Sequence, residues 1–483
     1  MIRVTVLTLL IVFGCSLQAI GQSPSPSDSP TAREGELKLV VALFRHGVRA
    51  PLKQIDDDPT KKPHAGKPWP ELSQWGATNW GYLTRHGHDL AKALGNYYAK
   101  WYTTKDGWPQ GFKAYLWADT DPRTIDTANA LAQGFELGGI PEQDVTLRFL
   151  ETKFTDPPTI TADPLFHPFK AKCGSPDTNK LEQTVAKINK AREEAAKNLR
   201  SSFEDLYGAL NCFAALSCLP LKTLGDNAVV CGDPNSSCKA KTCESPISWY
   251  GTVDENCPPG QWPYASTASE TFLLEYANNM APNLVGWGRV DAVKNLLPMM
   301  QLHEKYFDFT EREPYLAQIG GSNLVREILD QLNRKAGRVE PIDGKCPRGN
   351  KESQFIGLIG HDTNLANVNT LLKLGWKFDN KDLPPDTFGL PGNDALPAGA
   401  LVFELRQRNG KYHVRVEYVT QSLDQMRKGP TGNAFRLPVQ GGPCGQTQPC
   451  EMSLDTFNTL VVNALGPDDR FLSRCSDGNE VCQ

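Results

Sequence analysis

No Cys-x-x-Cys pair occurs in the sequence, although it contains 13 cysteines among 483 residues. Structural zinc sites commonly use such pairs, so their absence argues against a zinc-bound module. Beyond the first 22 residues, no stretch approaches the ~20 consecutive apolar residues of a membrane-spanning helix. An excess of charge is missing as well, because the formal net charge is only −4. These absences give no sign of a membrane protein or of a nucleic-acid partner.

The N-terminus has the pattern of a secretory signal, with a basic start, an apolar stretch and small residues up to a predicted cleavage after Gly21. Residues 22–36 follow as a Ser/Pro-rich linker with too little apolar surface to fold. Lipidation at Cys15 is an alternative to cleavage, but Phe13 fits that motif poorly. We therefore expect a periplasmic or secreted protein that has no membrane contact once residues 1–21 are removed.

The cysteine content agrees with export. Removal of Cys15 leaves 12 cysteines, an even number spread over the mature chain, which favours disulfides. Six of them lie between residues 212 and 263, in a region rich in Pro, Gly and Asn that we expect to be irregular. The larger block 176–312 also contains segments with helical spacing of apolar residues. We interpret this block as a helical, cysteine-rich insertion in an α/β domain made of residues 37–175 and 313–483.

Buried strands define that α/β domain. Three apolar runs each end in a polar turn followed by apolar residues at helical spacing: residues 37–44, 114–118 and 355–360. This pattern predicts an open, mostly parallel sheet flanked by helices, with ligands beyond the carboxyl ends of its strands. Two further runs, 400–405 and 412–419, predict a hairpin across Asn409-Gly410 at the edge of the sheet.

The turns after the three strands carry the polar groups expected to meet a ligand. In chain order they are Arg45, His46 and Arg49 after the first, Asp119 and Arg123 after the second, and His361 and Asp362 after the third. If the strands are parallel neighbours, these groups converge. Three guanidiniums around one point repel each other unless an anion lies between them, and their planar forks match phosphate oxygens. A phosphate group is therefore the predicted ligand.

The same residues suggest a reaction. His46 with a free ring nitrogen can attack phosphorus and form a phosphohistidine. Asp362 can protonate the departing alkoxide if it is neutral when the substrate binds, which predicts an acidic working pH. His361 and the arginines would stabilise charge on the transferring oxygens. Each residue also has a simpler interpretation, because Asp362 can be a helix cap and Arg123 a surface charge.

An isolated Arg-His-Gly tripeptide is weak evidence, because the chain contains a second copy at 85–87. That copy has no preceding apolar strand and has Asp89 where the first copy has an arginine, so we interpret His86 as a helix-start or surface residue. His303, on an apolar helix, is expected to be a satisfied core histidine, and His413 an ordinary strand residue. The three strand-end sets together are far more specific than any one of them.

Residues 45–51 match the signature Arg-His-Gly-x-Arg-x-Pro, and the distal pair 361–362 matches His-Asp. On these motifs the chain resembles the histidine acid phosphatases, especially the bacterial periplasmic branch with phytases and glucose-1-phosphatases. Further matching stretches are 118–124, 163–166, 286–289 and 421–427, so the resemblance covers nearly the whole mature chain. It implies an active site between an α/β domain and a helical insertion, with no metal or other cofactor. We expect a monomer that acts on a small-molecule phosphomonoester.

The resemblance also implies residue roles. His46 resembles the family's nucleophile and Asp362 its proton donor. The residues that resemble its phosphate-binding groups are Arg45, Arg49, Arg123 and His361, and those that resemble its substrate pocket are Lys53, Asp119, Glu270 and Thr363. The implied disulfides are Cys173 with Cys475 and Cys444 with Cys450. The other eight cysteines allow 105 pairings that sequence does not rank.

The substrate is the open question. Phytases of this branch carry Thr directly after the signature proline, whereas Leu52 stands here, as in the glucose-1-phosphatase-like members. Lys53 and the run 361–367 are instead phytase-like. We therefore expect phytate, with a sugar phosphate as the alternative. An exported binding protein with an inactive site should lack His46 or Asp362, and both are present. A phosphotransferase or mutase fits export and disulfides less well.

Overall fold

We describe the protein from a computed structural model. It describes residues 35–52, 69–108, 111–150, 162–168, 177–210, 262–338, 349, 351–445 and 449–466. The predicted signal, most of the linker, Lys53, Cys173, Cys475 and the cysteine-rich stretch 212–261 lie outside these residues. Within the described ranges, no helix has the length and apolar character needed to cross a membrane.

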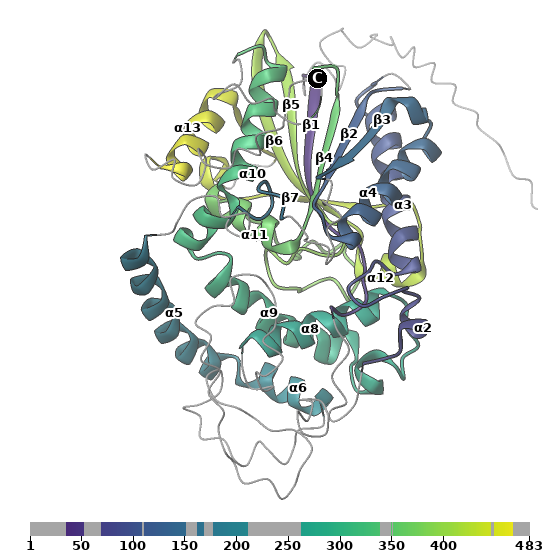
Figure 1. Cartoon of the computed structure of the whole chain (residues 1–483), viewed down its shortest axis with the longest axis vertical. Coiled ribbons are helices and arrows are strands. Elements are labelled where there is room, and N and C mark those ends of the chain that lie inside the picture. The colour runs from purple at the N-terminus through teal and green to yellow at the C-terminus, as the bar shows by residue number, and fades with distance from the viewer. Residues whose placement is uncertain are drawn as a thin grey trace, which may run out of the picture.

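The centre of the fold is a sheet in the order β3-β2-β4-β1-β5-β6-β7, with β8 paired to β6 (Figure 1). Its strands are β1 (Glu36–Arg45), β2 (Ala114–Ala118), β3 (Val145–Phe149), β4 (Phe355–Gly360), β5 (Ala400–Arg408), β6 (Lys411–Thr420), β7 (Phe435–Pro438) and β8 (Cys450–Ser453). The four neighbours β3, β2, β4 and β1 are parallel, and β5 is antiparallel to β1. The predicted α/β fold, with a mostly parallel central sheet flanked by helices, is confirmed.

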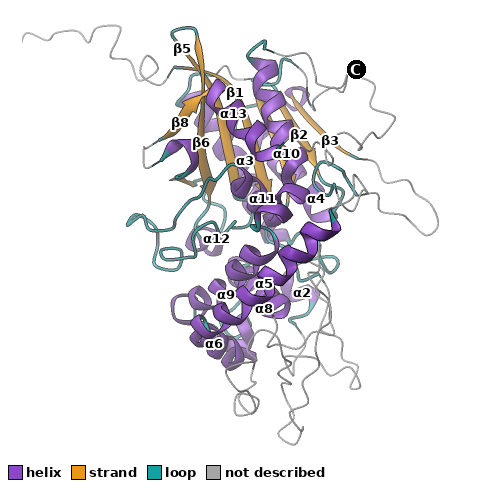
Figure 2. Ribbon diagram, turned by 90° about the vertical axis from the view of Figure 1, so that its left-hand side faces the viewer, coloured by secondary structure: helices purple, strands orange, loops and turns teal. Residues whose placement is uncertain are grey.

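Helices flank the sheet and also gather beyond one end of it. Those beside the sheet are α3 (Arg85–Thr104), α4 (Pro122–Leu137), α10 (Pro314–Lys335), α11 (Asp362–Leu371) and α13 (Leu454–Leu465). The others are α2 (Leu72–Trp75), α5 (Thr178–Asn198), α6 (Arg200–Leu210), α8 (Trp262–Ala277), α9 (Leu297–Thr310) and α12 (Leu423–Lys428). Shorter helical turns are η2 (Glu142–Asp144), η4 (Val285–Gly288), η5 (Ala292–Leu296) and η7 (Gly442–Cys444). Figures 1 and 2 show α5, α6, α8 and α9 together at this end.

The strand β1 is apolar on both faces because each face supports a separate core. Side chains alternate across a strand, and Val40, Ala42 and Phe44 pack in the core that includes Tyr98 of α3. Leu39, Val41 and Leu43 belong to the other core, together with Leu324 of α10. A central parallel strand covered on both sides therefore has a continuous apolar run rather than an alternating one.

The predicted hairpin is present, but its predicted place at the sheet edge is wrong. Strand β5 pairs with β1 as well as with β6, and β6 pairs further with β7 and β8. These last two strands have four residues each, too short to give a clear period in the sequence. Strand β3 also escaped prediction, because its side chains are only partly buried or exposed and form no apolar run.

Helix packing explains the glycine in the second Arg-His-Gly tripeptide, residues 85–87. Helix α3 begins at Arg85, and the Thr84 hydroxyl caps it by accepting the Gly87 N–H at 2.8 Å. A side chain at Gly87 would collide with the carbonyl oxygen of Val48. The glycine therefore lets α3 approach the loop that follows β1.

One disulfide lies in the described part of the chain. It joins Cys444 to Cys450, with 5.0 Å between their Cα atoms. This is one of the two pairings that the resemblance implied, and the other, Cys173 with Cys475, lies outside the described residues.

Candidate active site

The sheet brings the three predicted strand ends together. Strand β4 lies between β1 and β2, so their carboxyl ends meet at one edge. The backbone N–H of His46 donates to the Gly360 carbonyl at 2.9 Å, and that of Asp119 donates to Ile359 at 2.9 Å. Because both bonds end on β4, the loops after β1 and β2 are held against the start of α11.

His46 has the form that a nucleophile requires. Its Nδ1 lies 2.9 Å from the carbonyl oxygen of Gly47, and because that oxygen only accepts, the ring proton is on Nδ1 and Nε2 keeps its lone pair. Burial and the charges of Arg123, Arg49 and Arg45 hold the pKa of His46 well below its usual value. The imidazole is therefore neutral even in acid.

The arginines occupy two positions. Arg49 and Arg123 line a cavity of about 150 Å³ beside His46, which is room for much more than one water molecule. The guanidinium of Arg45 is not among its described lining groups, and it instead contacts Glu270, the Ala395 carbonyl oxygen and Asp362. Glu270 also pairs with Arg49 at 3.1 Å. Its carboxylate thus neutralises two guanidiniums that were predicted to hold an anion.

Asp362 lines the same cavity at the first turn of α11. The residue in the N-cap position is His361, so helix capping does not explain Asp362. Burial opposes ionisation of Asp362, but Arg45, 3.0 Å away, acts together with His303, His361 and Arg49 and lowers the pKa to about 2. In the free site this group is a carboxylate at any ordinary pH.

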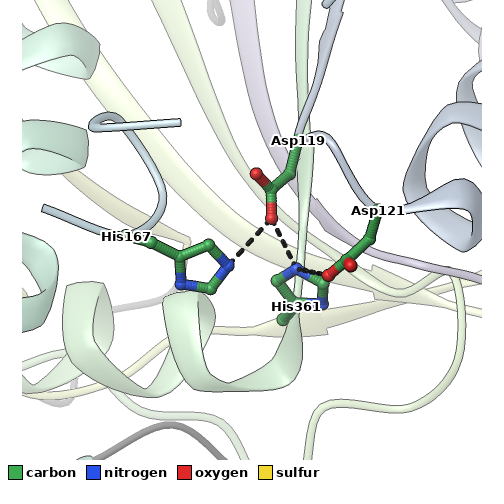
Figure 3. Close-up of side chains that lie close together, drawn as sticks. All are labelled: Asp119, Asp121, His167 and His361. Carbon is green, nitrogen blue, oxygen red and sulfur yellow. Dashed lines mark hydrogen bonds and ion pairs between the residues drawn. The ribbon is translucent and has the colours of Figure 1, made fainter. Parts of the chain in front are cut away.

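Asp119, which the resemblance placed in the substrate pocket, contacts two histidines. It is fully buried and not among the described groups that line the cavity, and its Oδ2 accepts N–H groups from His361 at 2.7 Å and from His167 at 2.8 Å (Figure 3). Burial opposes its ionisation, but these two hydrogen bonds hold its pKa below the usual range. Asp119 therefore orients two histidines from a position behind the described lining of the cavity.

His361 joins these groups to Arg123. Burial and Arg123 lower the pKa of His361, but hydrogen bonds to Asp119 and Asp121 outweigh them and raise it. The Nη2 atom of Arg123 lies 3.3 Å from Nδ1 of His361 and 2.9 Å from a carboxylate oxygen of Asp121. Arg123 and His361 thus stand together at the cavity wall beside His46.

The remaining candidates divide as follows. Glu270 and Thr363 line the cavity, whereas Lys53 lies outside the described residues. His303 is buried with Nδ1 2.9 Å from the Ser266 hydroxyl, as expected of a satisfied histidine, but its ring also lines the cavity. His86 contacts the Met426 carbonyl from the first turn of α3, and His413 lies in β6.

Asp121 and His167 are among the cavity residues that sequence reasoning missed. Asp121 lies inside the stretch 118–124, and His167 directly follows 163–166, so both adjoin segments that were already singled out. Their chemical part depends on contacts with residues far away in the chain, which no local pattern shows.

A neutral histidine with a free nitrogen, next to guanidiniums and a carboxyl group at the ends of parallel strands, defines an enzyme of phosphoryl transfer. The sequence model described as Histidine phosphatase superfamily (branch 2) matches residues 36–419. The chain belongs to this family and is a phosphomonoesterase.

Known proteins similar to the chain agree with this assignment. Phytase AppA of Escherichia coli (strain K12) is 29% identical over 415 residues, which cover 83% of this chain and 85% of that protein. Glucose-1-phosphatase of Providencia rettgeri is 24% identical over 431 residues, which cover 86% and 88%. The structure of Hafnia alvei phytase in complex with myo-inositol hexakis sulphate matches with a TM-score of 0.68 and 27% identity, over 91% of this chain and 99% of that one.

Proposed function

We propose that the protein is an exported acid phosphatase that hydrolyses phytate through a phosphohistidine on His46, with Asp362 as proton donor. The observation that carries this proposal is the state of His46, which lines the cavity with Nδ1 engaged and Nε2 unprotonated. Arg49, Arg123 and His361 surround the same space and supply the positive charge that a transferring phosphoryl group needs.

In the first step the lone pair of His46 Nε2 attacks phosphorus and the bond to the ester oxygen breaks. Asp362 gives its proton to that oxygen, and the alcohol leaves. In the second step water attacks the phosphohistidine, and the Asp362 carboxylate accepts a proton from it. The N–P bond breaks, phosphate leaves and His46 is restored.

Substrate binding prepares Asp362 for this role. Its pKa of about 2 in the free site leaves it without a proton. A phosphate group brings negative charge into the cavity and competes with the carboxylates for Arg45 and Arg49, which raises the pKa of Asp362. For the same reason Glu270 must release these arginines when the substrate enters.

The proposed substrate and the proposed export are supported by the sequence and by similarity to known proteins. Phytate is supported by the similarity to Phytase AppA and Hafnia alvei phytase. Export is supported by the signal pattern in residues 1–21. We also propose residues 176–312 as the insertion and the rest of the folded chain as the α/β domain, since α9 ends at Thr310 and α10 contributes to the core under β1. We also propose that the protein is a monomer.

Glucose 1-phosphate is the second candidate, and Leu52 favours it. This side chain follows the signature proline, lines the cavity and is 38% exposed. An apolar group there offers no hydrogen bond to an additional phosphate of a polyphosphorylated substrate.

The test compares initial rates of the purified mature protein on phytate and on glucose 1-phosphate at acidic pH. We expect kcat/KM to be at least tenfold higher for phytate. A higher kcat/KM for glucose 1-phosphate would assign the second function.

A Glu270→Ala variant tests whether Glu270 contributes to the choice of substrate. Equal loss of the two rates in this variant would show that Glu270 does not select the substrate.

A further inference from the structure

Two aspartates and two histidines form a tight cluster (Figure 3), and three of the four line the cavity. They are Asp119, Asp121, His167 and His361, and one ligand atom from each lies within 4.8 Å of all the others. The Nε2 atom of His361 is 2.7 Å from Asp119 and 3.3 Å from Asp121, and that of His167 is 2.8 Å from Asp119. Phosphoryl transfer uses His361 but does not by itself explain why four such groups meet.

We propose that these four side chains bind one divalent transition-metal ion of the Zn²⁺ type, and that the ion inhibits the enzyme. Two imidazole nitrogens and two carboxylate oxygens are a suitable ligand set for zinc. Bond lengths of about 2.0 to 2.2 Å in a tetrahedral site separate neighbouring ligand atoms by roughly 3.3 to 3.5 Å. The three closest pairs would therefore move apart by less than about 1 Å, and the ion would replace the Nε2 protons of both histidines.

The ligands are held by structure independent of the ion. Asp119 Oδ1 accepts the N–H of Thr120 at 2.8 Å, which leaves Oδ2 directed to the histidines. The segment with His167 is fixed because Trp117 donates to Asp163 at 2.7 Å and Asn364 donates to the Phe166 carbonyl at 2.9 Å. A supported ligand set is one requirement of a metal site, and an entry path is another. The cavity supplies that path, since Asp121, His167 and His361 line it.

Inhibition follows from the position of Arg123. Its guanidinium is held by Asp121 at 2.9 Å and lies 3.3 Å from His361. When Asp121 turns to the ion, Arg123 loses the carboxylate that positions it, and a divalent charge appears beside it. At the same time the ion displaces the Nε2 proton of His361, which is released to solvent. Both groups are then unable to stabilise the transferring phosphoryl group.

The first experiment measures metal binding directly, so it does not depend on the proposed phosphatase activity. Tag-free protein is titrated with Co²⁺, whose tetrahedral complexes absorb visible light, and with Zn²⁺ by calorimetry. The variants are His167→Phe, which keeps an aromatic ring but removes its nitrogens, and His88→Phe on α3 as the matched control. We expect one ion per chain in the wild type and the control, and at least tenfold weaker binding in His167→Phe.

The second experiment measures Zn²⁺ inhibition of aryl phosphate hydrolysis, because phytate itself chelates metal ions. Each variant is compared with its own metal-free rate, and its thermal unfolding shows whether it is folded. The inhibition constant should rise at least tenfold in His167→Phe and stay unchanged in His88→Phe. No visible Co²⁺ band in the wild type, or equal metal affinity in His167→Phe, would overturn the proposal. Absence of any phosphatase activity would instead count against the proposed function.

Discussion

The strand ends and the helical half of the molecule both contain carboxyl groups that are at least partly buried, and the pKa values of three such groups in each part move in opposite directions. Those at the strand ends, Asp119, Asp121 and Asp362, have lowered pKa values because nearby histidine and arginine charges outweigh burial. In the helical half burial dominates, and the pKa is raised to about 8 for Glu275, about 7 for Glu304 and about 7 for Glu311. The three groups at the strand ends therefore remain ionised in acid, whereas the three in the helical half become neutral.

This difference explains how the cavity can bind an anionic phosphate ester at acidic pH. At the strand ends, ionised carboxylates hold Arg123 and His361 in place. Across the cavity, Glu311 is neutral below about pH 7 and does not repel a phosphate group. The chemistry is therefore concentrated on the strand ends, and on the helical side Glu311 adds no negative charge in acid while Glu270 is paired with Arg45 and Arg49.

The largest effect should come from the strand ends themselves. His46→Ala removes the nucleophile, and we expect turnover of an aryl phosphate at acidic pH to fall by on the order of 10⁴ or more. His86→Ala is the matched control, since it alters the same tripeptide where the ring only contacts the Met426 carbonyl. Its turnover should remain within about twofold of the wild type. Comparable losses in both variants would remove His46 from the reaction.

A smaller and more selective effect is expected from Asp362→Asn. The amide cannot protonate a departing alkoxide, so hydrolysis of alkyl phosphates should slow by about 10²- to 10⁴-fold. Phosphoenzyme formation from an activated aryl phosphate, followed by rapid quench, should be affected much less because its leaving group needs no proton. If both classes of substrate slowed equally, Asp362 would not be the proton donor.

The two halves also differ in how well sequence could predict them. The strand ends at Arg45, Ala118 and Gly360 follow apolar runs, and such runs are local signals. Their parallel pairing then places His46 near His361 without further information. Neither the contacts of Arg45 with Glu270 nor those of Asp119 with His167 could be predicted, because each joins residues that are far apart in the chain.

Strand length and burial explain the remaining differences in the fold. The short strands β7 and β8 and the partly exposed β3 have too few apolar residues to be recognised. Their absence from the prediction is why the hairpin was placed at the sheet edge. For the helical half, the sequence predicted that helices occur but not how they are arranged. Their arrangement depends on packing, which the spacing of apolar residues does not reveal.

The smallest effect tests the helical half through stability. Glu275 is fully buried, its Oε2 accepts the Gly286 N–H at 2.7 Å, and its Oε1 has no hydrogen-bond partner among the described residues. Because its folded pKa of about 8 exceeds the unfolded value, the folded state keeps a proton that the unfolded state loses. The contribution of Glu275 to the free energy of unfolding should therefore be largest below about pH 4.5. Between that pH and pH 8 it should fall by roughly 1 kcal/mol per pH unit.

Glu275→Gln should flatten that slope, since an amide does not titrate. Urea unfolding at pH 5.5 and 8 compares it with the wild type and with Glu136→Gln, an exposed control on α4. The amide group lacks a second partner and should lower stability at the acidic pH by about 1 to 3 kcal/mol. The variant should nevertheless lose less stability than the wild type between the two pH values. An identical loss in all three proteins would mean that Glu275 is not a source of acid stability, and the contrast between the halves would then rest on Glu304 and Glu311.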